Sequence, residues 1–229
     1  MQEKVILSWS GGKDSALALY ELHKAGDYEI VTLLTTISRD HDRICMHGVR
    51  RGLLEQQAGA LGLPLETVFI SKDASNDEYE SQMREVLTRY LAAGVCSVAF
   101  GDILLEEIRA YRQQKLSAIG MKGLFPLWKR DTAELASTFI SLGFKAVITS
   151  ANCNCLQSGC VGRAFGEQFL ATLPAAVDPC GENGEFHSFV YDGPIFSRRV
   201  SHTAGEVVLR ENGFYYCDLT PCNNGAYPE

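Results

Sequence analysis

The sequence has no long apolar run and no excess of basic residues. No stretch approaches the roughly 18 apolar residues that a membrane-spanning helix needs. Residues 1–12 combine Glu3 and Lys4 with a short apolar run, which is not the pattern of a signal peptide. The 21 Lys and Arg against 28 Asp and Glu give a net charge of −7. We therefore expect a soluble, cytoplasmic protein that does not bind membranes or nucleic acid through its overall charge.

Cysteine is too scarce for a disulfide scaffold, with 8 in 229 residues, so we expect reduced thiols. Cys153, Cys155 and Cys160 lie close together, but their spacing is not C-x-x-C. Buried or incidental thiols are the favoured interpretation, and a Zn²⁺ site or sulfur chemistry stays open. Cys217 and Cys222 either pair or flank a simple turn.

Short apolar runs alternate with helical patterns along the first two thirds of the chain. This alternation is typical of βαβ units and predicts an α/β fold with a Rossmann-like parallel sheet of about five strands. The expected strands cover residues 5–9, 29–36, 65–70, 97–100 and 145–149, and the expected helices cover 14–25, 48–61, 77–93, 106–119 and 132–142.

The composition of the sequence changes from Ser150 onward, where Cys, Asn, Gly and Pro become frequent. We expect a second, smaller α+β domain there. Pro126-Leu127-Trp128 is the expected crossover, so residues 1–125 form the predicted first domain and residues 126–229 the second.

A glycine-containing loop follows the first expected strand, and its sequence is Ser10-Gly11-Gly12-Lys13-Asp14-Ser15. Glycines bring backbone amides close to a ligand, and a helix N-terminus attracts phosphate. The serine hydroxyls can donate to phosphate oxygens, Lys13 can supply a positive charge, and Asp14 can cap the helix or hold Mg²⁺. The loop therefore predicts a seat for pyrophosphate.

This hexapeptide is neither a Walker A loop nor the Rossmann G-x-G-x-x-G. Ordinary γ-phosphoryl transfer and dinucleotide binding are therefore disfavoured. The segment resembles the hallmark of the PP-loop, or N-type, ATP pyrophosphatases, whose domain is of the HUP type. That resemblance implies cleavage of ATP between the α and β phosphates.

A second diagnostic stretch covers residues 178–187, Asp-Pro-Cys-Gly-Glu-Asn-Gly-Glu-Phe-His. It resembles the C-terminal signature of the diphthine–ammonia ligase family. Further matching marks are Met46-His47, Gly101-Asp102-Ile103, Pro126-Leu127-Trp128, Arg130-Asp131 and Gly143-Phe144. The resemblance runs from Val5 to about Phe196.

The resemblance implies an ATP-dependent, Mg²⁺-requiring amidation of a carboxylate by ammonia, with AMP and pyrophosphate as products. In that family the carboxylate belongs to diphthine on elongation factor 2, so a protein acceptor or another carboxylate is the expected partner. Whether the chain forms a homo-oligomer stays open.

The polar residues of the decapeptide, residues 178–187, suit this chemistry. Glu182, Glu185 and His187 are candidate general bases, and we group them with Lys13 and Asp14 as catalytic. Asn183 and Gly184 are candidate substrate contacts. Two further substrate candidates are Asp102, at the carboxyl edge of the sheet, and His47, from the family match.

Two other functions stay open from the sequence. One is a regulatory protein that holds AMP or ATP without turnover, and pyrophosphate release would separate it from a ligase. The other is tRNA thiolation by a PP-loop enzyme, which calls for catalytic cysteines and a basic surface.

Overall fold

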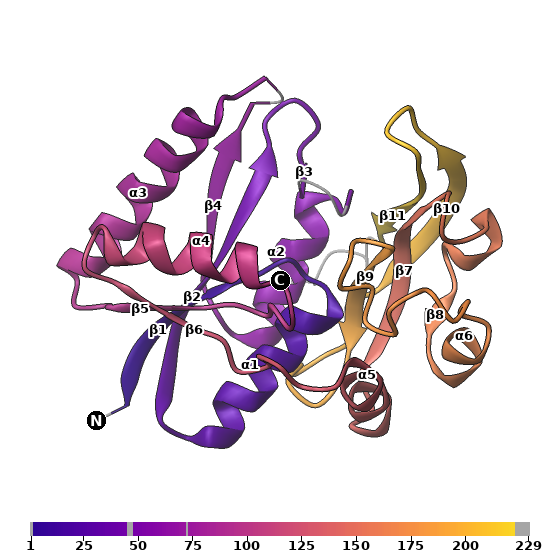
Figure 1. The fold of residues 1–229 in the computed structure, drawn as a ribbon, viewed down its shortest axis with the longest axis horizontal. Helices are drawn as coiled ribbons and strands as arrows, with labels where there is room; N and C mark the ends of the chain where they lie inside the picture. Colours follow the sequence, from indigo (N-terminus) through magenta and orange to yellow (C-terminus); the bar gives the residue numbers. More distant parts are fainter. Residues whose placement is uncertain (1, 45–47, 72, 223–229) are drawn as a thin grey trace, which may run out of the picture.

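Two β-sheets organise the computed structural model, which describes residues 2–44, 48–71 and 73–222 (Figure 1). The first sheet has five parallel strands in the order β4-β2-β1-β5-β6. They are β1 (Glu3–Ser8), β2 (Tyr28–Ser38), β4 (Leu65–Ile70), β5 (Ser97–Ala99) and β6 (Lys122–Leu124). A short strand, β3 (Arg43–Ile44), pairs antiparallel with the end of β2.

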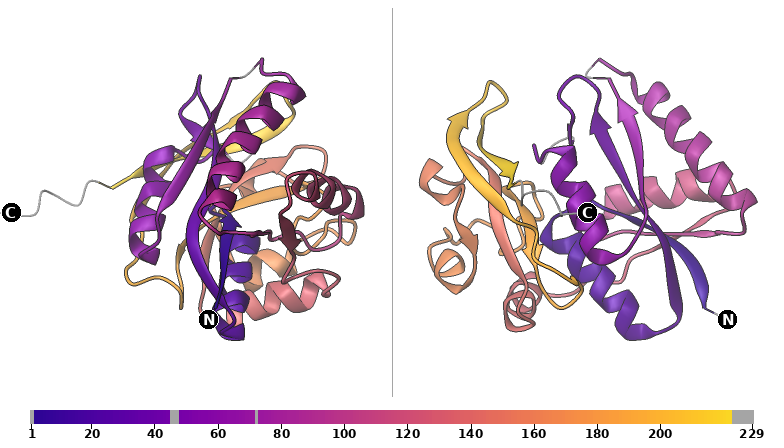
Figure 2. Two further views of the ribbon diagram at one scale, coloured as in Figure 1. Left: turned by 90° about the vertical axis from the view of Figure 1, so that its left-hand side faces the viewer. Right: turned by 180° about the vertical axis from the view of Figure 1, so that it is seen from behind.

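Helices cover both faces of the first sheet (Figures 1 and 2). One face carries α3 (Asn76–Ala92) and α4 (Glu106–Ser117), whose Leu87 and Leu116 join strand residues such as Ile6 and Val98 in one apolar cluster. The other face carries α1 (Lys13–Ala25) and α2 (Arg51–Leu61). Because α1 is covered on several sides, the consecutive residues Ala16, Leu17, Ala18 and Leu19 are all buried.

The second sheet is antiparallel and packs against α1 and α2. Its strands are β7 (Lys145–Asn152), β8 (Ala164–Phe165), β9 (Phe186–Asp192), β10 (His202–Leu209) and β11 (Phe214–Pro221). Two helices, α5 (Thr132–Ser141) and α6 (Glu167–Ala171), accompany it. The larger apolar cluster includes Leu7 and Leu19 from the first lobe and Phe144 and Phe189 from the second, so the two lobes share one core.

The α/β class with a parallel sheet is confirmed, but one predicted strand lies elsewhere. The run at 145–149 was expected in the parallel sheet, yet it forms β7 of the second sheet and pairs only antiparallel. The fifth parallel strand is β6, beside β5. β6 reads Lys-Gly-Leu and has a single apolar residue, so no pattern marks it as a strand, whereas the buried strand β7 has the continuous apolar run that usually marks a parallel sheet.

The predicted helix boundaries agree with the structure to within a few residues. Gly26 ends α1 with φ of 75°, the left-handed conformation expected of a glycine after a helix. Ser75 and Asp131 accept backbone hydrogen bonds at the starts of α3 and α5. Across the described residues, no helix is long and apolar enough to span a membrane.

Candidate active site

The glycine loop connects β1 to α1, and its glycines and serines fix its path. Gly11 has φ of 72°, and a side chain there would come within 2.7 Å of Gln57 Oε1. Ser15 donates its hydroxyl to the Gly12 carbonyl at 2.9 Å, and the Gly12 amide donates to Ser10 Oγ at 3.3 Å. Gly12, the N-cap residue of α1, has no side chain to cap the helix, so the first turn of α1 is a candidate site for an anion.

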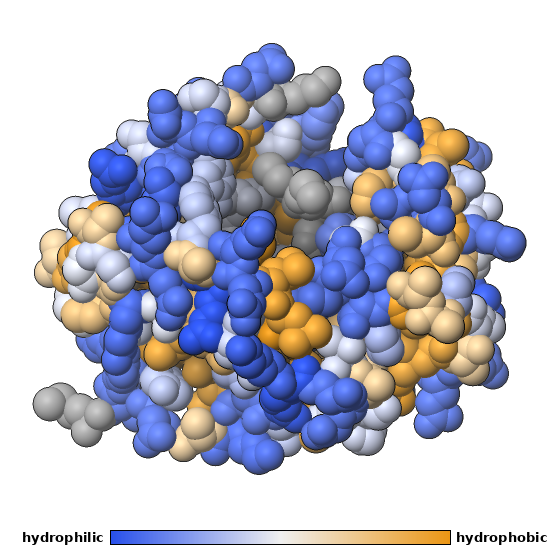
Figure 3. All heavy atoms as spheres, in the orientation of Figure 1, coloured by the Kyte–Doolittle hydropathy of each residue, from blue (hydrophilic) through white to orange (hydrophobic). Residues whose placement is uncertain are grey.

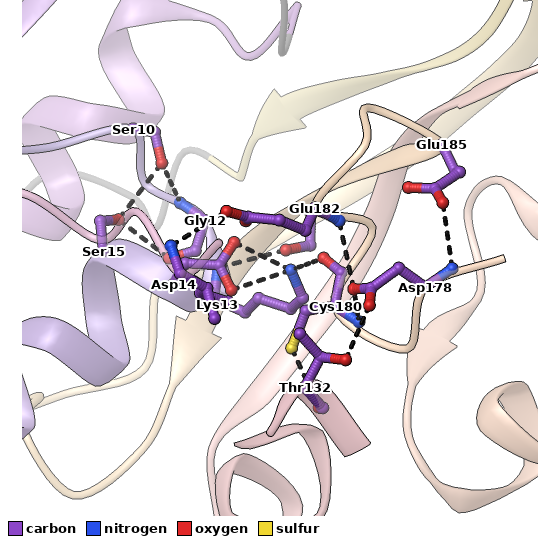
Figure 4. A network of polar contacts seen from close by, with 12 residues as sticks. Ser10, Gly12, Lys13, Asp14, Ser15, Thr132, Asp178, Cys180, Glu182 and Glu185 are labelled. Carbon is purple, nitrogen blue, oxygen red and sulfur yellow. Dashed lines mark hydrogen bonds and ion pairs between the residues drawn. The ribbon is translucent and has the colours of Figure 1, made fainter. Parts of the chain in front are cut away.

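Lys13 extends from this loop into the second lobe (Figure 4). Its side chain is only 5% exposed, and Nζ lies 3.0 and 2.9 Å from the two carboxylate oxygens of Asp14. Nζ also donates to the Cys180 carbonyl and lies 5.4 Å from the centre of the Phe186 ring. Burial alone would lower the pKa of Lys13, but Asp14 and other negative groups outweigh burial, and this pKa lies above its ordinary value.

Asp14 is the negative partner of Lys13 in this ion pair. Burial raises the pKa of Asp14, and Lys13 opposes that rise. Its side chain keeps 33% exposure, so its carboxylate is still accessible from solvent. The pair therefore places one positive and one negative charge at the start of α1.

The decapeptide is a loop shaped by its own carboxylates, followed by the start of β9. Asp178 Oδ1 accepts the amides of Cys180 and Glu182 at 2.8 and 3.2 Å, and Thr132 donates its hydroxyl to Oδ2 at 2.7 Å. Glu185 accepts the amide of Asp178 at 3.0 Å, and the amide and side chain of Asn183 at 3.0 and 3.1 Å. Both carboxylates therefore hold the loop in shape.

Figure 4 shows Glu182 beside Asp14 of the glycine loop, whereas Glu185 lies farther from that loop. Glu182 Oε1 accepts the amides of Ile103 and Leu104, both at 2.9 Å, and so ties the decapeptide to the loop after β5. Burial raises the pKa of Glu182, and Asp14 adds to that rise. A carboxyl of this kind exchanges a proton closer to neutral pH than an ordinary glutamate.

His187 lies on β9, where Ser150 of β7 is its strand partner. Its ring stacks on Phe214 with 6.3 Å between centroids. Burial, and secondarily Lys13, lower the pKa of His187 to about 4. His187 is therefore an uncharged imidazole at neutral pH.

The loop that follows β5 brings Asp102 towards the site. Asp102 Oδ2 lies 2.9 Å from Nε of Arg112, and burial raises the pKa of Asp102. Gly101 packs against the start of α1, because a side chain there would lie 2.8 Å from the Asp14 carbonyl carbon. His47, the remaining predicted substrate contact, lies outside the described residues.

The sequence did not point to several residues that complete the site. Gln57 of α2 is fully buried, accepts a hydrogen bond from Trp9 Nε1 at 2.9 Å and donates to the carbonyls of Gly11 and Val190. Ser188 of β9 accepts the Lys13 amide at 3.2 Å. Asp178, Cys180 and Thr132 contribute as described above. Gln57 and Ser188 lie far from the glycine loop in sequence. Of the two, only Ser188 stands near a recognised motif, because it directly follows the decapeptide.

A crevice opens where the parallel strands end, next to the glycine loop. It has a volume of about 190 Å³, and its lining includes Ser10, Thr35, Thr36, Val98 and Phe100. Open α/β sheets bind their ligands at this edge. A crevice at the strand ends beside a helix N-terminus is a candidate nucleotide site.

The seven described cysteines are all free thiols. Cys153, Cys155 and Cys160 line a cavity in the second lobe, but no group of three or more Cys, His, Asp or Glu side chains among the described residues is arranged to hold a metal ion. Cys217 donates to the Gly205 carbonyl, and Cys222 contacts Thr203, so these two do not pair. Burial raises the pKa of Cys180 to about 12, so its thiol is protonated.

A parallel α/β sheet whose first strand leads through Ser-Gly-Gly-Lys-Asp-Ser into a helix defines the PP-loop class of nucleotide-binding proteins. Within that class, the chain belongs to the diphthamide synthase family. The sequence model of the diphthamide synthase N-terminal domain matches residues 3–123, and that of the C-terminal domain matches residues 131–220.

Curated relatives agree with this family. The chain is 28% identical to the diphthine–ammonia ligase of Danio rerio over 89% of its length and 88% of the relative's. It is 24% identical to the human diphthine–ammonia ligase, covering 87% and 83% of the two chains. It is also 28% identical to the Schizosaccharomyces pombe diphthine–ammonia ligase over 92% of its own length, but spans only 38% of that longer protein.

Among solved structures, the chain shows a likeness to the U34-tRNA thiolase NcsA from Methanococcus maripaludis with its [4Fe-4S] cluster. The TM-score is 0.38 and the identity 15%, with 62% of this chain and 58% of that one covered. A likeness at this level has no bearing on the function of the chain.

Proposed function

We propose that the chain is an ATP-dependent ligase that joins ammonia to a carboxylate and releases AMP and pyrophosphate. One observation carries the proposal. The phosphate-binding loop and the family's C-terminal decapeptide meet at Lys13, whose Nζ contacts Asp14 on one side and the Cys180 carbonyl on the other. Groups suited to ATP and groups suited to an acceptor therefore share one site.

The proposed reaction has two steps. An oxygen of the acceptor carboxylate bonds to the α-phosphorus of ATP while the bond to the β-phosphate oxygen breaks, and pyrophosphate leaves. Ammonia then bonds to the acyl carbon, the carbon–oxygen bond to AMP breaks, and the nitrogen loses a proton. The first step is needed because a free carboxylate is a poor electrophile with a poor leaving group.

Residues 1–125 are the proposed ATP-binding part. Ser10, Gly11, Gly12, Lys13, Asp14 and Ser15 would surround the departing pyrophosphate with amides, hydroxyls and one positive charge. Asp14, with its partly exposed carboxylate, would hold Mg²⁺. One carboxylate together with phosphate oxygens is the usual environment of this ion, which when bound neutralises charge on the phosphates.

Residues 126–229 are the proposed acceptor-binding part, and they supply the groups that move or orient protons. Glu182 is the proposed general base for the incoming nitrogen, because its pKa is raised by burial and its carboxylate lies beside Lys13 and Asp14. Glu185 would act by holding Asn183 in place. His187 would offer a neutral imidazole to the acceptor.

The acceptor in the relatives' names is diphthine, which occurs on elongation factor 2. A protein-borne carboxylate is accordingly the first acceptor to test. Asp102, Asn183, Gly184 and His47 are the proposed contacts of the acceptor.

The test is to incubate the protein with Mg²⁺, ammonium and α-labelled ATP, with and without a diphthine-bearing elongation factor, and to separate AMP from ADP. We expect AMP only when the acceptor is present. Lys13→Ala should abolish AMP formation, while Lys24→Ala, an exposed lysine on the same helix, should leave it unchanged. Formation of ADP would overturn the proposed cleavage between the α and β phosphates.

A further inference from the structure

A second cavity, of about 690 Å³, lies between the two lobes beyond the nucleotide crevice. The ends of β2 and β4 and the start of α3 form one side, and the hairpin of β10 and β11 forms the other. Figure 3 shows the surface hollowed between the tips of the two lobes at this end of the molecule. Cavities between lobes are where small ligands usually bind. We call this the interlobe cavity.

Its charge differs from that of the whole protein. Three basic residues, His41, Arg43 and Arg210, line the interlobe cavity, and none of the described lining residues is Asp or Glu. The chain as a whole carries 28 acidic against 21 Lys and Arg residues. A positive cavity in a negative protein points to an anionic ligand.

Arg43 is fixed in place and its charge is only partly balanced. Its Nη1 donates to the Gly48 carbonyl and to Asp218 Oδ1, both at 2.8 Å. The same carboxylate also binds Arg50, at 3.0 and 2.6 Å, so one negative charge serves two guanidinium groups. These two arginines hold the pKa of Asp218 well below its usual range. The Asp218 carboxylate therefore balances only one of the two positive charges of Arg43 and Arg50.

Arg210 faces the interlobe cavity from the opposite lobe. Its guanidinium lies 5.0 Å from the Tyr216 ring centre, and Asn212 donates to the Tyr216 hydroxyl at 2.9 Å. Across the cavity, Ser75 and Asn76 line it at the start of α3. The lining thus combines two arginines with hydroxyl and amide side chains, which suits a carboxylate.

The interlobe cavity adjoins the nucleotide crevice. Thr36, Ile44 and Tyr79 line both. A molecule held by Arg43 and Arg210 would therefore lie next to the crevice that borders the glycine loop. The cavity is the larger of the two spaces, at about 690 against 190 Å³.

We propose that the interlobe cavity binds the carboxylate acceptor, and that this acceptor carries a second anionic group, which Arg43 and Arg210 hold. The proposal rests on the ligase function proposed above. The carboxylate that reacts must lie at the glycine loop, and it loses its charge when the acyl–phosphate bond forms. The arginines lie at the other end, so they recognise a group that stays anionic through both steps.

The test is a titration of ¹⁵N-labelled full-length protein, without ATP, with glutarate and with its monoamide at matched ionic strength. The two probes have nearly the same shape but differ by one negative charge. We expect glutarate to shift the amide signals of residues 75–76 and 210–216, and its monoamide to bind at least about fivefold more weakly. Arg210→Gln should weaken glutarate binding by about tenfold, and Arg43→Gln should have a comparable effect. Arg198→Gln, an exposed arginine outside the cavity, should leave it unchanged.

Equal binding of the two probes, no shifts at residues 210–216, or an equal effect of Arg198→Gln would overturn the proposal. Because the titration contains no ATP, its result is independent of turnover. If the protein forms AMP but does not bind glutarate, the ligase function stands and the proposed acceptor site is refuted. If it binds glutarate through Arg210 but forms no AMP, the anion site stands and the ligase function is refuted.

Discussion

Replacing Lys13 by methionine tests the buried contact that joins the two lobes. The substitution keeps most of the side-chain length but removes the charge, so the Asp14 carboxylate loses its partner at 2.9 and 3.0 Å and the Cys180 carbonyl loses its donor. Breaking a fully buried ion pair costs about 3–5 kcal/mol. Because the Asp14 side chain is 33% exposed, water screens part of the loss. We expect about 2–3 kcal/mol less unfolding free energy at pH 7.

The loss should depend on pH in a definite direction. Without Lys13, its charge and its hydrogen bond no longer lower the pKa of Asp14, and burial raises that pKa further. The folded variant then binds a proton more tightly than the unfolded chain, whose Asp has a pKa of about 3.9. Stability of the variant therefore falls as the pH rises through and above that value, and its deficit against wild type shrinks on acidification.

Urea denaturation followed by tryptophan fluorescence at a series of pH values measures both effects. The double variant Lys13→Met with Asp14→Asn is the control, because it removes the unpaired carboxylate and should recover much of the stability. A single variant within about 0.5 kcal/mol of wild type would refute the reasoning, since a loss that small is typical of surface substitutions. A double variant that is no more stable than the single variant would also refute the reasoning.

Three further substitutions probe other parts of the site. Gln57→Leu leaves three buried hydrogen-bonding groups around the glycine loop without their partner and should cost about 2–4 kcal/mol of unfolding free energy in urea. Asp218→Asn should lower the unfolding free energy by only about 1 kcal/mol at pH 7, because the Asp218 side chain is 38% exposed. The difference from wild type should vanish as the pH falls below about 4 towards the depressed pKa of folded Asp218, and a difference independent of pH would contradict the ion-pair explanation. Gly101→Val should push the loop against Asp14 and reduce AMP formation at least about tenfold, whereas Gly159→Ala, with open space around it, should not.

Much of the first lobe could be predicted from local pattern. Strands β1 and β2 end at serine, and Gly26 and Gly62 end α1 and α2, so the alternation of the two is visible without any long-range information. The second lobe was not predicted strand by strand. Strands such as β10 are exposed along most of their length and lack the alternation that marks a half-buried strand.

The site was predictable where its residues form one contiguous motif. The glycine loop and the decapeptide each carry their chemistry within a few positions of the chain. Gln57 and Ser188 lack such a signal, because Gln57 lies 46 positions from Gly11 and Ser188 lies 175 positions from Lys13, its hydrogen-bond partner. Nor does spacing alone separate Glu182 from Glu185, since only the fold decides which carboxylate lies beside the glycine loop.

A backbone hydrogen bond of 2.9 Å from the Val190 amide to the Gly11 carbonyl connects β9 to the glycine loop. Among side-chain substitutions, only proline at position 190 would remove the donor of this hydrogen bond, and Val190 itself belongs to the shared apolar cluster. Residues 1–125 consequently depend on the second lobe for the conformation of their glycine loop. Grafting residues 1–125 onto another acceptor domain would carry the loop sequence but leave behind the strand that fixes its path, so new specificities in this architecture have to arise by changing loops within an intact pair of lobes.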